Sequence, residues 1–244
     1  MAAQKKVSLY NSDINILGGI PDYTAMIRYV TDSLGASQGS EFSFRTENAL
    51  KRFVAAIGRN LLTFKSKQHK KVITEALSDS SLRDDQKYII IFWQMLVNNE
   101  LFAAITENYF MKCLYAGRLT LSFDEIQSYL FELRRQHPNE LQWSDATLKI
   151  TVSKYLTMLK KLGLAEGSQT KEIHHPIIGD ELFVYFVRLA LAVYPKKATE
   201  DNPLFKYSFL DTTSLVNKLK AIKFTPYWQI EQLGNNIKIE LSHE

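Results

Sequence analysis

The chain has 244 residues, of which 45% are hydrophobic, so it is long enough to bury a core of ordinary density in one large domain or two modest ones. Its formal net charge of +4 favours nucleic acid or another anionic partner without requiring one. A single cysteine, Cys113, excludes an intrachain disulfide and favours a reducing compartment.

No apolar segment of the sequence suggests export or membrane insertion. No apolar stretch of the kind that a secretory signal needs follows the first lysines. The most apolar segment, LFVYFVRLALAVY at residues 182–194, is too short to span a bilayer as a helix and carries Arg188. We therefore expect a cytoplasmic protein without membrane association.

The first part of the chain predicts a helical bundle. Start and stop signals and apolar spacings of three and four residues predict helices at residues 21–35, 44–64, 68–77, 82–96 and 101–115, with a small-residue loop at 36–40. The segment YIIIFW within residues 82–96 is apolar almost all round, which is typical of a helix at the centre of a bundle.

The pattern changes after Gly117. Residues 119–121 alternate like a short strand, and Ser122 with Glu125 forms a capping-box pattern that starts a helix at residues 123–136. Ser144 then caps a further helix, which Gly163 ends in a left-handed conformation. Residues 164–166 and 173–177 can pair as strands around the polar turn GSQTK.

Helix, strand, helix, helix, strand, turn and strand is the order of a winged helix. In such modules the third helix enters the major groove of DNA and the hairpin, or wing, contacts the neighbouring backbone or minor groove. The loop at residues 137–143 is longer than the tight turn of a simple helix-turn-helix, which could alter how the third helix is presented. Winged helices also serve as protein-docking modules, so DNA binding and protein docking both stay open as functions of this segment.

The third helix is strongly two-sided. A helical projection places six apolar residues on one face: Leu148, Val152, Tyr155, Leu156, Leu159 and Leu162. The opposite arc contains no acid and carries Thr147, Ile150, Thr151, Ser153, Lys154, Thr157, Lys160 and Lys161, with Lys149 at its border. Lysines and hydroxyls suit phosphate contacts, and Lys171 in the hairpin adds a further cation.

A second basic region precedes this module. Residues 45–71 contain one acidic residue, Glu47, and eight cationic residues. The cationic residues are Arg45, Lys51, Arg52, Arg59, Lys65, Lys67, Lys70 and Lys71. The run KSKQHKK within it is compact enough to contact several phosphates, although such residues also solvate helix surfaces. We name it as a second candidate DNA contact.

Signals for catalysis or metal binding are weak. His174 and His175 are adjacent and lack a spaced partner, so we expect them in the far strand of the hairpin rather than in a metal site. The chain has no P-loop, dinucleotide fingerprint or GxSxG motif. We expect no enzymatic activity, no catalytic residue, no metal and no cofactor.

The last third predicts a small α/β extension. After the helix at residues 182–194 we expect a strand at 204–210, a helix at 212–221 and a terminal hairpin of residues 227–233 and 237–241. The whole pattern is mainly α. We expect three domains: a helical bundle at residues 1–97, a winged helix at 98–178, and the extension at 179–244.

Five segments together resemble the BrxA family of BREX bacteriophage-exclusion systems. They are SFRTENALKRF, DDQKYIIIFWQMLVNNELFAAITENYF, LTLSFDEIQSYL, TLKITVSKYLTMLKKLGLAEG and HHPII, and they span residues 43–178. The resemblance implies a non-enzymatic DNA-binding component of phage defence, in which a NusB-like amino-terminal bundle precedes the winged helix. It implies no catalytic residues, and its DNA contacts map onto the third helix, Lys171 and the basic region already described.

The predicted function is therefore that of a double-stranded DNA-binding accessory or regulatory component of a BREX system, acting through phosphate contacts with weak sequence preference. One alternative is an adaptor whose winged helix holds a methyltransferase or ATPase subunit, for which an exposed apolar patch around Ile150 would speak. Another is an RNA-binding module, which the NusB-like comparison suggests.

Overall fold

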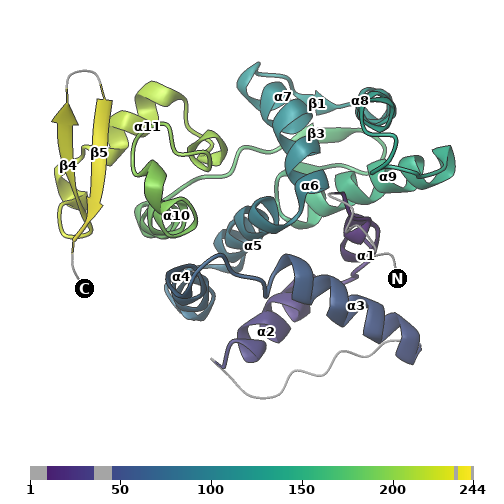
Figure 1. The fold of residues 1–244 in the computed structure, drawn as a ribbon, viewed down its shortest axis with the longest axis horizontal. Coiled ribbons are helices and arrows are strands. Elements are labelled where there is room, and N and C mark those ends of the chain that lie inside the picture. The colour runs from purple at the N-terminus through teal and green to yellow at the C-terminus, as the bar shows by residue number, and fades with distance from the viewer. Residues whose placement is uncertain (1–9, 36–45, 234–235, 243–244) are drawn as a thin grey trace, which may run out of the picture.

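The computed structural model describes residues 10–35, 46–233 and 236–242, and the architecture is mainly helical, with two small antiparallel sheets (Figure 1). The amino-terminal helices are α1 (Asp13–Leu17), α2 (Tyr23–Ser33), α3 (Glu47–Asn60), α4 (Lys67–Ser78) and α5 (Asp84–Asn98). The predicted loop at residues 36–40 and the position of Arg45 lie outside the described residues.

A helix with a π-helical segment opens the middle of the chain: α6 (Glu100–Ile105), the π segment (Thr106–Phe110) and α7 (Met111–Tyr115). There follow β1 (Thr120–Leu121), α8 (Phe123–Gln136), α9 (Asp145–Lys161), β2 (Ala165–Glu166) and β3 (Lys171–Ile173). The last part contains α10 (Asp180–Val193), α11 (Thr212–Leu219), β4 (Trp228–Leu233), β5 (Asn236–Leu241) and 3-10 turns at Pro195–Lys197, Phe205–Tyr207 and Ile222–Phe224.

The starts of α8 and α9 coincide with the two predicted caps, Ser122 and Ser144. Ser144 Oγ accepts the Thr147 N–H at 3.2 Å and Ser122 Oγ accepts the Glu125 N–H at 3.3 Å. The capping box at Ser122 is nevertheless only half formed, so that part of the prediction is wrong. The Glu125 carboxylate pairs with Arg118, and the Ser122 N–H donates to the Tyr109 hydroxyl instead.

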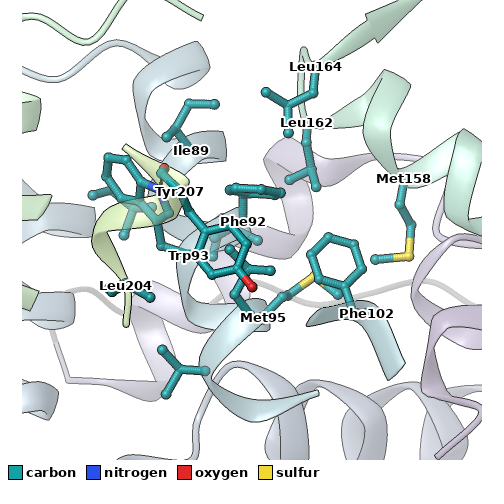
Figure 2. Close-up of a cluster of buried hydrophobic side chains, with 14 of the residues drawn as sticks. Ile89, Phe92, Trp93, Met95, Phe102, Met158, Leu162, Leu164, Leu204 and Tyr207 are labelled. Atoms are coloured by element: carbon teal, nitrogen blue, oxygen red, sulfur yellow. Dashed lines mark hydrogen bonds between the residues drawn. The ribbon is translucent and has the colours of Figure 1, made fainter. Parts of the chain in front are cut away.

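Helix α5 lies at the centre of the molecule, as predicted from YIIIFW (Figure 1). One buried cluster joins Trp93 and Phe92 of α5 to Leu162 at the end of α9 and to Leu204 and Tyr207 from the last part of the chain (Figure 2). The indole N–H of Trp93 donates to the Tyr207 carbonyl at 2.9 Å. Apolar contact on all sides of α5 thus ties the parts of the chain together, while the three-domain division stays a prediction.

Three predicted elements differ from the structure: the helix at residues 44–64, the strand at 204–210, and the far strand of the hairpin, which was predicted at 173–177 and lies at Lys171–Ile173. The helix predicted at residues 44–64 ends at Asn60. The turn that follows is held by the side-chain amide of Gln94 in α5, which donates to the carbonyls of Leu61 and Thr63. The predicted strand at 204–210 is wrong. Its residues form a 3-10 turn, and Phe209 adopts a left-handed φ of 61°.

The reason for the second error is burial. Leu204, Phe205 and Tyr207 are all buried, and an extended strand would point successive side chains to opposite faces. A tight turn lets all three enter the same core.

The sheet of the middle segment has the order β1-β3-β2, all antiparallel. Gly163, with a φ of 73°, ends α9 as predicted and directs the chain into β2. Gly167, with a φ of 87°, starts the turn between β2 and β3, where a Cβ atom would meet the Thr170 carbonyl oxygen at 2.2 Å. The carboxyl-terminal hairpin of β4 and β5 was also predicted correctly.

Across residues 10–35, 46–233 and 236–242, no individual helix combines the length and apolar character needed to cross a membrane. The pair Asp84–Asn98 and Glu100–Tyr115 meets the length and composition test together, but it is bent by 106°.

Candidate nucleic-acid interface

The buried face of α9 is the one that the sequence predicts. All six of its predicted apolar residues are buried: Leu148, Val152, Tyr155, Leu156, Leu159 and Leu162. Helix α8 packs against α9, and the Tyr155 hydroxyl lies 3.1 Å from that of Thr106 in the π segment. Burial raises the pKa of Tyr155 far above its usual value, so this hydroxyl stays protonated.

The opposite face of α9 is narrower than predicted, because α1 packs across part of it. Thr151 has no exposed surface, and its hydroxyl donates to the Thr147 carbonyl at 2.9 Å. Lys154 is half-buried beside Gly18. The prediction that Thr151 is exposed is therefore wrong, and its side chain cannot reach a ligand on this surface.

Lys161 is also engaged within the protein. Its ammonium group donates to the Gly18 and Ile20 carbonyls at the end of α1 and lies 5.5 Å from the centre of the Tyr23 ring. Burial, together with the nearby charge of Lys154, lowers the pKa of Lys161. This lysine joins α9 to the amino-terminal helices rather than presenting a free charge.

The face that remains accessible carries Lys149, Ser153 and Lys160, which are exposed, and Thr157, which is half-buried. Lys149 and Lys160 stand eleven residues apart, which corresponds to roughly 16 Å along a helix. Within the described residues, none of the lysines of α9 forms an ion pair with an acid. This strip is therefore cationic and not neutralised from within.

The β2–β3 hairpin continues this strip. Lys160 and Lys171 both donate to the Gly167 carbonyl, at 3.1 and 3.0 Å, which brings the end of α9 next to the turn. Glu166 and Glu172 face each other across the two strands and are exposed. The hairpin thus has mixed charge, with its cation on the side of α9.

Other cations of the same segment are neutralised by acids. Arg118 pairs with Glu125 at 2.7 Å, and Arg134 pairs with Asp145 at 2.8 Å. Arg135 pairs with Glu132 at 2.7 Å. The accessible lysines of α9 differ from these arginines in keeping their charge available to a partner.

The second predicted basic region is divided by the fold. Helix α3 packs against α1, on the side of α9, whereas α4 packs against α10 on the other side of α5 (Figure 1). Lys65, Lys67, Lys70 and Lys71 are exposed at the α4 end. They do not continue the surface of α9, so the described part of this region, residues 46–71, does not form one basic surface with it.

Two of the described cations of α3 already have acidic partners. Lys51 pairs with Glu47 at 2.6 Å, and Arg59 pairs with Asp13 at 2.7 Å. Arg52 is exposed and lines a cavity between α1 and α3. Among the α3 candidates, Arg52 is the one without an acidic partner among the described residues.

The prediction that His174 and His175 lie in the far strand of the hairpin is wrong, because β3 ends at Ile173. His174 lies just after β3, and its Nδ1 is 2.7 Å from the Gly163 carbonyl oxygen. No cluster of three or more metal-ligating side chains occurs in the part of the chain that the structure describes. Cys113 is buried, and burial raises the pKa of its thiol.

These features define a mainly helical protein that presents a cationic helix face beside a short β-hairpin. The model of the BrxA family matches residues 38–189, well over half of the chain, and the chain therefore belongs to the BrxA family. Membership implies a component of a BREX phage-defence system. None of the curated proteins matches this chain.

Proposed function

We propose that this BrxA protein is a non-enzymatic, double-stranded DNA-binding accessory component of a BREX system. In this proposal, residues 98–178 act as a winged helix, with α9 as its third helix and the β2–β3 hairpin as its wing. The order of the elements and the β1-β3-β2 sheet support this assignment. The amino-terminal helices α1 to α5 would form the NusB-like bundle that the family resemblance implies.

The observation that carries the proposal is the accessible strip of α9, where Lys149 and Lys160 are exposed and have no acidic partner among the described residues. A helix of this kind, with cations roughly 16 Å apart along its axis, can reach the phosphates on both sides of a major groove about 12 Å wide. Ser153 between them can donate a hydrogen bond to a phosphate or a base edge.

Binding should depend mainly on phosphate neutralisation. The accessible strip has no arginine, asparagine or glutamine for bidentate base contacts, so weak sequence preference is expected. Contacts from Lys149, Lys154, Lys160 and Lys171 would release about four counterions, and log affinity should then fall with log salt at a slope of about −3 to −4.

Fluorescence anisotropy with a labelled duplex tests the proposal. The Lys149→Glu/Lys160→Glu variant should bind at least about tenfold more weakly, because it replaces two phosphate contacts by repulsion. A control variant, Lys196→Glu/Lys197→Glu, makes the same charge change at exposed positions after α10 and should bind within about twofold of the wild type. Equal weakening in both variants, or no binding at low salt, would contradict the proposal.

One observation favours a second candidate, a protein-docking adaptor that holds a methyltransferase or ATPase subunit. Ile150, which is 51% exposed, lies on the same side of α9 as Lys149 and Ser153. An Ile150→Glu variant that loses a BREX partner in a pull-down while keeping duplex affinity would support docking. An RNA competitor that displaces the duplex better than unlabelled DNA would instead support the RNA-binding alternative.

A further inference from the structure

An apolar groove of about 570 Å³ lies between the end of α7, the turn at residues 200–206 and the start of α11. No residue of α9 lines it, and in Figure 1 α11 lies to the left of α7 while most of α9 lies to its right. Sites for drug-sized ligands measure about 300–1,000 Å³, so the groove has room for about two or three amino-acid side chains.

The apolar lining of the groove can be reached from outside and is held in place. The Tyr115 ring is 48% exposed and Leu210 is half-buried, while the buried Phe205 and Leu215 complete the lining. The Tyr115 hydroxyl donates to the carbonyls of Lys206 and Leu210, at 3.1 and 3.2 Å, which fixes the position of the ring. A preformed surface of this kind costs little conformational entropy on binding.

The turn that forms one wall of the groove is also fixed. Asn202 is buried, and its side-chain amide donates to the carbonyls of Ala190 and Lys197 at 3.2 and 2.9 Å. Its Oδ1 atom accepts the Leu204 N–H at 3.0 Å. These hydrogen bonds hold the neighbouring Asp201, which is exposed, at the edge of the groove.

The edge of the groove is acidic. Glu200, Asp201 and Asp211 line it, and none of them forms an ion pair with a cation of the described residues. The lysine of the lining, Lys206, pairs with Glu107 at 2.5 Å. Hydrogen bonds from the first turn of α11 lower the pKa of Asp211, so this carboxylate is charged at neutral pH. The groove therefore combines apolar surface with negative charge that is not neutralised.

This combination restricts what the groove can bind. Nucleic acids are repelled by the carboxylates. The acids do not form a metal site, since no group of three or more metal-ligating side chains occurs among the described residues. A small polyamine would match the charge but leave the apolar lining empty. A peptide with a large apolar side chain beside lysine or arginine matches both the lining and the acids.

We propose that this groove docks a basic segment of a partner protein. An apolar side chain of the segment packs against Tyr115 and Leu210, and its flanking lysines or arginines pair with Asp201 and Asp211. The groove is separate from the accessible strip of α9, so docking does not compete with a ligand on that strip. The inference goes beyond the proposed function and does not rest on it, because docking requires no DNA.

Fluorescence anisotropy with labelled synthetic peptides and the full chain tests the proposal. A peptide in which lysines alternate with leucines should bind at least about fivefold more tightly than one in which lysines alternate with serines, because only the first fills the apolar lining. A peptide of alternating glutamates and leucines should not bind. Equal binding of the leucine and serine peptides, or binding of the glutamate peptide, would overturn the proposal.

A charge-neutral variant locates the binding. Asp201→Asn/Asp211→Asn removes two carboxylates and keeps a capping side chain at the start of α11. It should bind the lysine and leucine peptide about fivefold more weakly. The control Asp84→Asn/Glu166→Gln makes the same change of charge at exposed positions outside the groove and should bind within about twofold of the wild type. Equal weakening in both variants would overturn the proposal, because the peptide would then respond only to net charge.

Two measurements distinguish other occupants. Sedimentation velocity of the wild type without peptide should show no self-association that Asp201→Asn/Asp211→Asn abolishes. Such self-association would mean that the groove holds a second copy of this chain. Spermidine at the concentration of the peptide should leave most of the peptide bound. Complete displacement by spermidine would mean that the groove is a polyamine site, and either result would overturn the proposal.

Discussion

Gly18 lies directly against Lys154, so that a Cβ atom on Gly18 would be 2.6 Å from the Lys154 carbonyl oxygen and 2.8 Å from the Lys154 Cβ. The φ of Gly18 is −65°, which any residue adopts, so glycine is required here for space rather than for conformation. This contact sets how closely α1 approaches α9, and with it how much of α9 remains accessible.

A Gly18→Ala substitution should therefore push α1 away from α9. We expect the free energy of unfolding to fall by about 1–3 kcal/mol, the usual cost of overpacking, as measured by chemical denaturation. Gly58→Ala is the matched control, because Gly58 lies within α3 and a Cβ atom there would meet nothing within 4 Å. That variant should be more stable by about 0.5–1 kcal/mol. Unchanged stability of Gly18→Ala would refute the close contact.

The ion pair between Asp13 and Arg59 should matter for stability more than for DNA binding. Arg59 donates to both Asp13 oxygens, at 2.8 and 2.7 Å, and Asn60 donates to the same carboxylate at 2.9 Å. The Asp13 side chain is 5% exposed, whereas that of Arg59 is 55% exposed and screened by solvent.

We expect Arg59→Gln to lower the free energy of unfolding by about 1–2 kcal/mol, since it leaves a buried carboxylate without its cation. Adding Asp13→Asn should recover part of this loss, which a double-mutant cycle by chemical denaturation measures. Fully additive effects of the two substitutions would show that the pair has no coupling.

His69 should make stability depend on pH. It is buried, its Nδ1 accepts the Lys65 N–H at 3.1 Å, and its Nε2 lies 2.7 Å from Gln94 Oε1. Burial lowers the pKa of His69 below its usual value of 6.5, and the Lys65 charge acts in the same direction. The folded protein therefore favours the neutral ring. Protonation of Nδ1 would break the hydrogen bond that this nitrogen accepts from the Lys65 N–H.

His69 binds a proton more readily in the unfolded chain than in the folded chain. The stability that the neutral His69 ring contributes to the fold is therefore fully present above about pH 6.5 and is lost as the pH falls below that value. Between pH 7.5 and 5.5 the wild type should lose more stability than His69→Gln, with a difference in slope of up to about 1.4 kcal/mol per pH unit. Parallel stability curves in urea titrations at several pH values would contradict this assignment.

Thr151 and Lys149 provide a test of which part of α9 is accessible. Thr151 is fully buried and Lys149 is exposed, although both were expected at the DNA interface. Thr151→Val keeps the shape of the side chain and should leave duplex affinity within about twofold, whereas Lys149→Gln should weaken it several-fold through loss of one phosphate contact. Anisotropy titrations at one salt concentration distinguish them. A large loss of affinity in Thr151→Val alone would mean that α1 leaves α9 on binding.

Much of the fold could be predicted because its signals are local. The cap at Ser144, the stop at Gly163 and the apolar face from Leu148 to Leu162 depend on neighbours within a few residues, and the structure has them as predicted. The π segment within the helix at residues 100–115 has no such signal, and neither does the left-handed Phe209. These follow from how side chains distant in the sequence fill one core.

The candidate site was predictable in kind but not in extent. The sequence determined by itself that α9 has one apolar face and one face rich in lysine and hydroxyl groups, because both follow from the helical period. Only the tertiary structure decided that α1 covers Thr151 and engages Lys161, and that α5 separates the lysines of α4 from those of α9. The reason is that contacts between helices distant in the sequence determine which surfaces are buried. The spacing of residues along one helix does not contain that information.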